Sequence, residues 1–166
     1  MKNIGWGIIG CGDVCEVKSG PAFQKANGSS LVAVMRRNFE LAKDFAKRHG
    51  VERYYSNAED LIHDPAVTAV YVATPPCHHK EFVLMAAQAK KAVYVEKPMA
   101  MNYKECNEMI EACKTGGVPL WVAYYRRALP RFLKIKEWLD QKIIGEVLMA
   151  SICLHQKVQD TILQVV

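Results

Sequence analysis

Residues 4–15 read IGWGIIGCGDVC, a short apolar run that ends in closely spaced glycines. A strict search for G-x-G-x-x-G matches residues 5–10, but those glycines would lie inside the first strand, whereas the motif requires them at a strand-to-helix turn. The stretch in the right context is residues 10–15, GCGDVC, in which a cysteine takes the third glycine position. There Gly10 would make the tight turn and Gly12 would let a pyrophosphate approach the backbone. The alternative is a tight turn that binds nothing.

Short apolar runs rich in Val, Ile and Tyr alternate with amphipathic stretches as far as residue 123. Apolar strands that alternate with helices of about 10–15 residues predict βαβ units and a parallel sheet. Right-handed crossovers then give an α/β, doubly wound Rossmann fold. The expected strands are 4–9, 31–35, 53–55, 67–73, 92–95 and 119–123, and the expected helices are 13–27, 38–49, 57–63, 78–89 and 102–115, the last closed by Gly116 and Gly117.

The pattern changes after residue 122, and we expect a domain over 1–122 followed by the start of a second domain over 123–166. In the second segment, residues 130–142 are amphipathic and predict one more helix. Residues 146–158 alternate between apolar and polar side chains, which predicts a long strand of an antiparallel sheet. No partner strand follows in the sequence, so we expect this open edge to pair with a second copy, giving a homo-oligomer. The alternatives are that the segment collapses onto the helix over 130–142 or is disordered.

Composition and charge exclude several classes of protein. The chain has 166 residues, 51% of them hydrophobic and 23% charged, which is typical of a globular protein. It has no apolar run of about 18 residues, so we expect no transmembrane helix. The first residues lack a small-residue cleavage site, so we expect no signal peptide. The net charge is +5, but no run of Lys or Arg exceeds two residues, so we expect no nucleic-acid partner.

Six cysteines are scattered along the chain without a C-x-x-C pair. Their spacing does not match that of zinc ligands, so no metal site is expected. The pattern is typical of reduced, mostly buried thiols in a cytoplasmic protein.

Two adjacent arginines follow the second expected strand. Sites for NAD usually carry an acidic residue about 20 positions after the glycine turn, where it accepts a hydrogen bond from the ribose 2′-hydroxyl. Here that place is taken by Arg36 and Arg37, and no acidic residue occurs between Val17 and Phe39. A pair of guanidinium groups suits a 2′-phosphate, which favours NADP, with NAD as the alternative cofactor. The alternative interpretation is that both arginine side chains are solvated and bind no ligand.

Charged and polar residues also follow the fourth and fifth expected strands. Ligands of open α/β sheets bind outside the carboxyl ends of the strands. Glu96 and Lys97 lie at that edge, as does the stretch Thr74-Pro75-Pro76. A lysine there could hold a substrate hydroxyl and stabilise charge as that hydroxyl is oxidised. The alternative interpretation is a surface ion pair.

These stretches resemble the Gfo/Idh/MocA family of oxidoreductases, named after glucose–fructose oxidoreductase, inositol dehydrogenase and a rhizopine-catabolism protein. The matching segments, which extend over residues 1 to about 150, are GIIGCGDV at 7–14, VATPPCHHKE at 72–81, VYVEKPMAMN at 93–102 and YYRRALPRFLKIKEWL at 124–139. The resemblance implies an NAD(P)-dependent oxidoreductase that acts on a sugar, polyol or related hydroxyl compound by hydride transfer.

The resemblance also implies roles for individual residues. It puts Gly10, Gly12, Asp13 and Val14 along the pyrophosphate, Arg36 and Arg37 at the adenosine ribose, Thr74, Pro75 and His79 along the nicotinamide half, Glu96 and Lys97 beside the nicotinamide with Lys97 as the catalytic lysine, and Tyr125 and Arg126 near the active site.

The sequence departs from the family in its second half. Family members carry an Asp and a His, separated by three residues, that complete the catalytic group, but no Asp-x-x-x-His follows Lys97 here. Members are also about twice as long, so we expect an incomplete copy that binds the cofactor without turnover. The alternative is a non-catalytic dinucleotide-binding or interaction module. A methyltransferase, which also has a glycine turn after its first strand, is disfavoured by the segments around Thr74 and Lys97.

Overall fold

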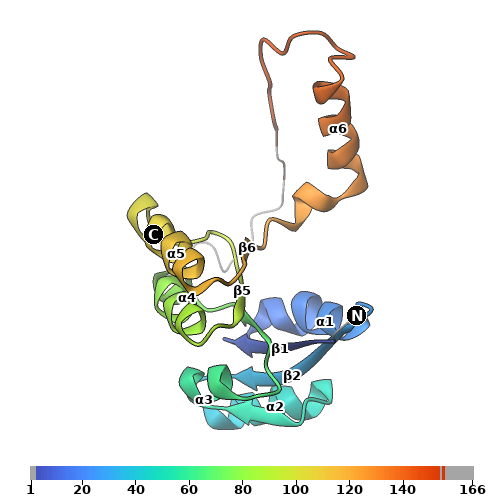
Figure 1. The fold of residues 1–166 in the computed structure, drawn as a ribbon. Coiled ribbons are helices and arrows are strands. Elements are labelled where there is room, and N and C mark those ends of the chain that lie inside the picture. Colours follow the sequence, from blue (N-terminus) through green and yellow to red (C-terminus); the bar gives the residue numbers. More distant parts are fainter. Residues whose placement is uncertain (1–2, 154, 156–166) are drawn as a thin grey trace. The chain divides into compact units, whose positions relative to one another are not determined.

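A six-stranded parallel sheet forms the centre of the first of two units into which the chain divides, residues 1–124 and 125–166 (Figure 1). The computed structural model describes residues 3–153 and residue 155. The strands are β1 (Ile4–Ile9), β2 (Ser29–Met35), β3 (Arg53–Tyr55), β4 (Ala69–Val72), β5 (Ala92–Val95) and β6 (Leu120–Val122). Their order is β3-β2-β1-β4-β5-β6, and each neighbouring pair is parallel, so the strand order reverses between β1 and β4.

Helices cover both faces of this sheet. They are α1 (Gly20–Lys25), α2 (Phe39–His49), α3 (Ala58–His63), α4 (His79–Gln88) and α5 (Tyr103–Gly116), with the short segments η1 (Cys15–Ser19), a π-helical turn, and η2 (Pro76–His78), a 3₁₀ turn. The side chains of Asn38, Asn57 and Asn102 accept backbone N–H groups at the starts of α2, α3 and α5. The expected doubly wound α/β fold is therefore confirmed.

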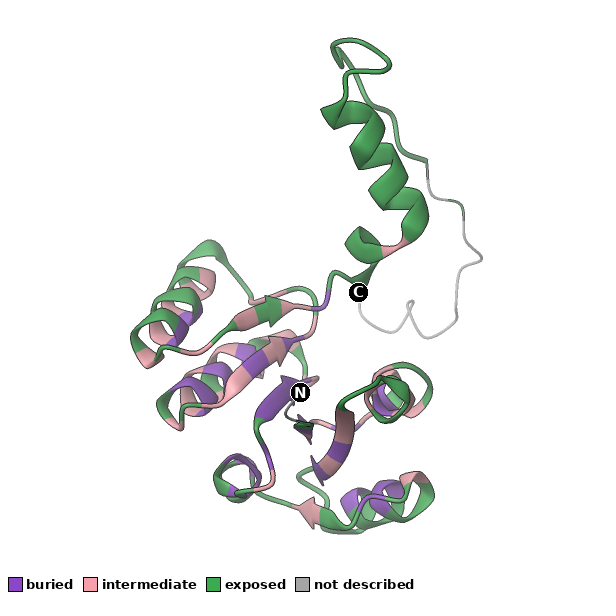
Figure 2. Cartoon of the chain, turned by 45° about the vertical axis from the view of Figure 1, so that its right-hand side comes forward, coloured by how far each residue is buried: buried purple, intermediate pink, exposed green. Residues whose placement is uncertain are grey.

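Two hydrophobic clusters form the core, one on each side of the sheet. Successive strand residues alternate between them: Ile9, Val70 and Val72 pack with α3, α4 and α5, whereas Ile8 and Tyr71 pack with η1 and α2. This alternation follows from the two-residue repeat of a strand. The buried residues in Figure 2 accordingly concentrate in the strands and on the inner sides of the helices.

The helix after the glycine turn differs from the expected helix over 13–27. It begins with Asp13 and Val14, widens into the π-helical turn η1, and ends as α1 at Lys25. The Gly20 N–H donates to the Cys15 carbonyl five residues earlier, which defines the wide turn. Residues 26–28 form the turn into β2 instead of continuing the helix.

The second unit contains η3 (Tyr125–Ala128) and α6 (Pro130–Asp140), which ends two residues before the expected boundary. Lys134 pairs with Glu137, and Lys136 pairs with Asp140. The expectation of a strand over 146–158 is wrong for residues 146–153, which are irregular and exposed, while the remainder lies outside the described residues apart from residue 155. Alternation of apolar and polar residues does not form a strand without a partner, since a lone strand is unstable in water.

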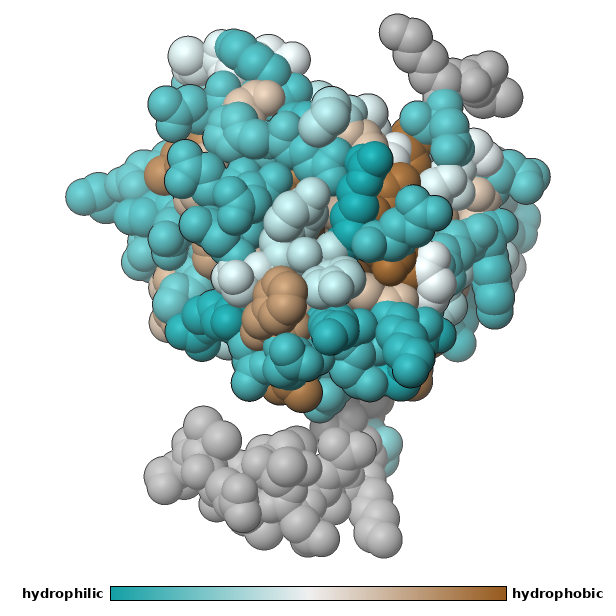
Figure 3. All heavy atoms as spheres, turned by 90° about the horizontal axis from the view of Figure 1, so that it is seen from below, coloured by the Kyte–Doolittle hydropathy of each residue, from teal (hydrophilic) through white to brown (hydrophobic). Residues whose placement is uncertain are grey.

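The surface seen from below in Figure 3 is mostly hydrophilic, with hydrophobic side chains in small groups. Within residues 3–153 and 155, no helix is long and apolar enough to span a membrane.

An ion-pair cluster joins the helix after the glycine turn to the end of α2. Glu16 in η1 accepts hydrogen bonds from Arg48 at both oxygens, from Nη2 at Oε1 (2.6 Å) and from Nη1 at Oε2 (2.7 Å), and Oε2 also lies 2.8 Å from His49 Nε2. Hydrogen bonds from Arg48 are the main cause that lowers the pKa of the Glu16 carboxyl to about 2 from its ordinary value of 4.5; burial opposes them, and the hydrogen bond with His49 adds to the lowering. The folded state therefore favours the ionised form of Glu16.

This shift predicts a pH dependence of stability. Because the folded-state pKa lies below the ordinary one, Glu16 stabilises the fold fully above about pH 4.5, and this stabilisation is lost as the pH falls toward about 2. We expect Glu16→Gln to lower the free energy of unfolding at pH 6 and to flatten its decline across that window, measured by urea denaturation at several pH values. Glu40→Gln, an exposed carboxylate on α2, is the control. Parallel stability-against-pH curves for wild type and Glu16→Gln would contradict the assignment.

Candidate functional site

The carboxyl ends of four neighbouring strands meet at one edge of the sheet, where backbone hydrogen bonds extend the strand pairing by one residue. The N–H of Gly10 donates to the Met35 carbonyl, that of Ala73 to the Ile9 carbonyl, and that of Glu96 to the Val72 carbonyl, each at 2.9 Å. The loops after β1, β2, β4 and β5 therefore start side by side. The edge includes the reversal point between β1 and β4, where ligands of open α/β sheets bind.

Gly10 and Gly12 differ in how much space the protein leaves beside them. Gly10 has φ +89°, and a Cβ there would lie 2.8 Å from Thr74 Cγ2 and 2.9 Å from the Thr74 backbone nitrogen. Only glycine permits both this backbone conformation and this close approach of the loop after β4. A Cβ at Gly12 would meet no protein atom nearer than 4.0 Å, so the protein leaves space beside this residue.

The helix start behind these glycines is closely packed. Cys15, in the third glycine position, is fully buried, and its Sγ lies 3.7 Å from the Gly10 carbonyl. Burial raises the pKa of Cys11 to about 11 and that of Cys15 to about 12, so both are neutral thiols at physiological pH and act as small apolar groups. Asp13 and Val14 follow the turn as the first helical residues, and Asp13 is exposed. The six cysteines are free, three of them buried.

A cavity of about 390 Å³ opens at this edge of the sheet. Its walls combine residues from the loops after β1, β2 and β4, and they are Gly10, Gly12, Met35, Arg36, Arg37, Asn38, Leu41, Ala73, Thr74 and Pro75. Both arginines are exposed, and neither forms a salt bridge with a carboxylate of the described residues. Their positive charge is therefore available to an anionic ligand.

Thr74, one of the residues that line this cavity, carries an unsatisfied polar group. Among the residues that the structure describes, its Oγ1 is the one buried side-chain oxygen or nitrogen without a hydrogen-bond partner. A buried polar atom costs free energy unless it is paired. The open space at Gly12 and the unpaired arginines of the same cavity fit an anionic ligand such as a dinucleotide.

His79 holds the loops after β4 and β5 together. It is the first residue of α4 and is fully buried. Its Nε2 lies 2.8 Å from the Thr74 carbonyl, and its Nδ1 lies 3.1 Å from the Pro98 carbonyl and 3.2 Å from that of Met99. The imidazole thereby connects the backbone of the loop after β4 to that of the loop after β5. Its role is structural, because both ring nitrogens face backbone carbonyls and neither faces the cavity.

Glu96 and Lys97 follow β5 at the same edge but do not form the surface ion pair that is the alternative interpretation of the sequence. One oxygen of Glu96 accepts the Tyr71 hydroxyl at 2.7 Å, and the other accepts the Lys97 backbone N–H at 2.9 Å. Lys97 is exposed, and its peptide bond to Pro98 is cis. Its ammonium takes part in no salt bridge of the described residues.

The sequence-based candidates thus divide into three groups. Gly10, Gly12, Arg36, Arg37, Thr74 and Pro75 line the cavity. Asp13 and Val14 begin the helix after the glycine turn, and His79 begins α4, while Glu96 and Lys97 lie on the loop after β5, which contributes no lining residue. Tyr125 and Arg126 belong to the second unit, in η3. Ser19 and Tyr71, which connect to Glu96, were not among the candidates. The sequence feature that could have indicated a role for Tyr71 is its hydroxyl group, which stands inside an otherwise apolar strand.

Within residues 3–153 and 155, no group of three or more His, Cys, Asp or Glu side chains is arranged to hold a metal ion. The fold and the cavity instead define a dinucleotide-binding Rossmann domain.

Comparison with known proteins identifies the family. The model of the Gfo/Idh/MocA oxidoreductase family, NAD-binding Rossmann fold, matches residues 4–124. A curated relative, "Oxidoreductase P35" of Formosa agariphila, is 54% identical over 155 residues, which cover 93% of this chain and 48% of the relative. The chain therefore belongs to the Gfo/Idh/MocA family of oxidoreductases, as its motifs indicated.

Two further proteins resemble the chain. The trans-1,2-dihydrobenzene-1,2-diol dehydrogenase of Danio rerio is 37% identical over 147 residues, which cover 86% of this chain and 43% of the relative. The crystal structure of KijD10, a 3-ketoreductase from Actinomadura kijaniata in complex with NADP and TDP-benzene, has a TM-score of 0.80 and 27% identity, covering 87% of this chain and 44% of that one. The chain spans about half the length of the curated relatives it matches.

We expect an added methyl group to act differently at the two glycines, on stability at Gly10 and on cofactor binding at Gly12. We expect Gly10→Ala to destabilise the fold by at least about 1–2 kcal/mol, because the added Cβ is strained at positive φ and collides with the Thr74 backbone. Gly12→Ala should leave stability nearly unchanged but weaken NADPH binding at least about tenfold, because the methyl group would occupy space reserved for phosphate. Thermal melting and calorimetric titration measure the two effects. Equal NADPH affinity in wild type and Gly12→Ala would contradict the placement of the phosphates.

Proposed function

We propose that the chain is the cofactor-binding part of an NADP(H)-dependent dehydrogenase that acts on a sugar, polyol or related hydroxyl compound. The observation that carries this proposal is the cavity at the sheet edge, in which Arg36 and Arg37 occupy the place where an acidic residue would bind the ribose of NAD. The ketoreductase in complex with NADP supports the cofactor, and the names of that protein and of the diol dehydrogenase support a ketone or hydroxyl substrate.

In the proposed complex, the pyrophosphate lies in the space beside Gly12, where the backbone amides of Asp13 and Val14 bind it with the help of the helix dipole. The guanidinium groups of Arg36 and Arg37 bind the 2′-phosphate, which their planar donors suit. Thr74 and Pro75 line the path toward the nicotinamide.

The substrate is proposed to bind beside Lys97. When bound, the nicotinamide supplies the hydride acceptor or donor for the reaction. The Lys97 ammonium donates a hydrogen bond to the substrate oxygen and stabilises the negative charge that develops there. Glu96 fixes the backbone amide of Lys97, and His79 contacts the carbonyl of the next residue, Pro98. These residues orient the lysine, and the Asp-x-x-x-His pair that the family resemblance implies does not occur among residues 98–166.

The cofactor preference is tested at Arg36. We expect Arg36→Asp to lower the ratio of NADPH to NADH affinity by at least about tenfold, because a hydrogen-bonded contact to a charged group contributes roughly 1.5–3 kcal/mol. Isothermal titration calorimetry with both cofactors measures the ratio. Lys47→Asp, which changes the charge of the exposed face of α2 by the same amount, is the matched control. An unchanged ratio in Arg36→Asp would rule out the proposed 2′-phosphate contact.

A second prediction concerns turnover. We expect the 166-residue chain to bind NADPH but not to reduce NADP measurably with polyols or sugars, because general acid–base catalysis contributes about 10²–10⁴-fold and its Asp-x-x-x-His pair is missing. Absorbance at 340 nm over a panel of sugars, polyols and diols measures this. Steady turnover by the purified chain would contradict the prediction, and failure to bind either cofactor would favour the non-catalytic interaction module.

A further inference from the structure

Tyr71 carries a buried hydroxyl in the middle of an apolar strand. It lies in β4 and is fully buried, between Val70 and Val72. Burying a hydroxyl costs free energy unless it is hydrogen-bonded. The Tyr71 hydroxyl has two partners, Glu96 Oε1 at 2.7 Å and Ser19 Oγ at 2.8 Å. These partners come from the loop after β5 and from η1, so one side chain connects the lysine loop to the helix behind the glycine turn.

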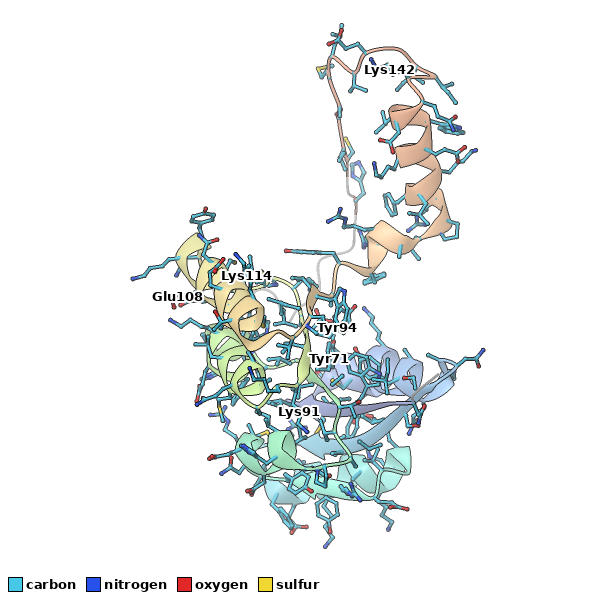
Figure 4. All side chains as sticks on the ribbon, in the orientation of Figure 1. Tyr71, Lys91, Tyr94, Glu108, Lys114 and Lys142 are labelled. Atoms are coloured by element: carbon cyan, nitrogen blue, oxygen red, sulfur yellow. The ribbon has the colours of Figure 1, made fainter. Side chains whose placement is uncertain are left out.

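The direction of these hydrogen bonds follows from the chemistry of the groups. A carboxylate can only accept, so the Tyr71 hydroxyl donates to Glu96. The Tyr71 oxygen is then left to accept, and the Ser19 hydroxyl donates to it. The ring of Tyr71 is held by an edge contact with Phe23, with centroids 5.2 Å apart, and by Tyr94 at 5.4 Å, which lies beside it on β5 (Figure 4). The donor is therefore fixed in position.

Both carboxylate oxygens of Glu96 accept hydrogen bonds. Its Oε1 accepts the Tyr71 hydroxyl, and its Oε2 accepts the backbone N–H of Lys97 at 2.9 Å. The neighbouring Lys97 ammonium forms no salt bridge with any carboxylate of the described residues, although the adjacent residue in the chain is an acid. An unrestrained carboxylate next to a lysine would be free to pair with it.

We propose that Tyr71, supported by Ser19, is a positioning residue that holds the Glu96 carboxylate away from the Lys97 ammonium and so keeps that amine free for a substrate oxygen. The need for a free amine rests on the proposed function of Lys97. Ser19 is the last residue of the π-helical turn η1, and its hydroxyl lies 2.8 Å from that of Tyr71.

The test measures the reactivity of the Lys97 amine directly, on the full chain and without cofactor. Trace labelling with acetic anhydride followed by mass spectrometry gives the acetylation rate of Lys97 relative to Lys47, an exposed lysine of α2 that forms no salt bridge with a described residue. Measurements between pH 7 and 10 give a profile of this ratio. Removing the hydroxyl in Tyr71→Phe frees Glu96 to pair with Lys97, so the ratio should fall about tenfold near neutral pH.

Tyr94→Phe is the matched control, because it removes a hydroxyl that makes no hydrogen bond to a described residue from the neighbouring position of the same aromatic cluster. Its ratio should equal that of the wild type. In the double variant with Glu96→Gln, the ratio should return to the wild-type value, because an amide does not form an ion pair with the ammonium. A general loosening of the structure would not be rescued in this way.

An unchanged ratio in Tyr71→Phe, or an equal fall in Tyr94→Phe, would overturn the proposal. If thermal melting shows that Tyr71→Phe does not fold, Ser19→Ala replaces it and should lower the ratio in the same direction, and an unchanged ratio there would also overturn the proposal. A separate NADPH titration of the wild-type chain distinguishes the two hypotheses. Lack of binding contradicts the proposed function, whereas the labelling ratio tests the role of Tyr71 alone.

Discussion

The close contact between the turn after β1 and the loop after β4 determines the rest of the site. At Gly10 the backbone has φ +89°, and any side chain would collide with the backbone of Thr74. Thr74 lies in the cavity wall beside Gly10 and Gly12. The reversal of strand order between β1 and β4 lies at the same point, which is where open α/β sheets bind their ligands.

The loop after β5 is attached to this centre by two side chains with different chemistry. His79 contacts the carbonyl of Thr74 on one side and those of Pro98 and Met99 on the other. Tyr71 connects Glu96 to Ser19 through hydrogen bonds. Lys97 is exposed, yet its backbone is fixed by Glu96. An exposed amine on a fixed backbone suits a group that must meet a substrate in a constant position.

The sequence predicted the six strands and the main helices because their apolar periodicity and their Asn and Gly boundaries are local signals. It also predicted the cavity residues that depend on chain position, such as Gly12 and Arg36, since the carboxyl ends of parallel strands share an edge. It could not predict the π-helical turn at residues 15–19 or the hydrogen bond from Tyr71 to Glu96, which depend on contacts between distant segments. The strand expected from residue 146 failed for a related reason: alternation shows which face could be buried, but a strand also needs a neighbour to pair with.

The cavity at the sheet edge is proposed to be one dinucleotide site. The most direct measurement is a titration of the ¹⁵N-labelled chain with NADPH, followed through ¹H–¹⁵N correlation spectra. We expect the largest shifts at the backbone amides of residues 10–14 and at Arg36 and Thr74, with smaller shifts at Lys97 and none on the outer faces of α4 and α5. Saturable binding that leaves the amides of residues 10–14 unshifted would contradict the claim.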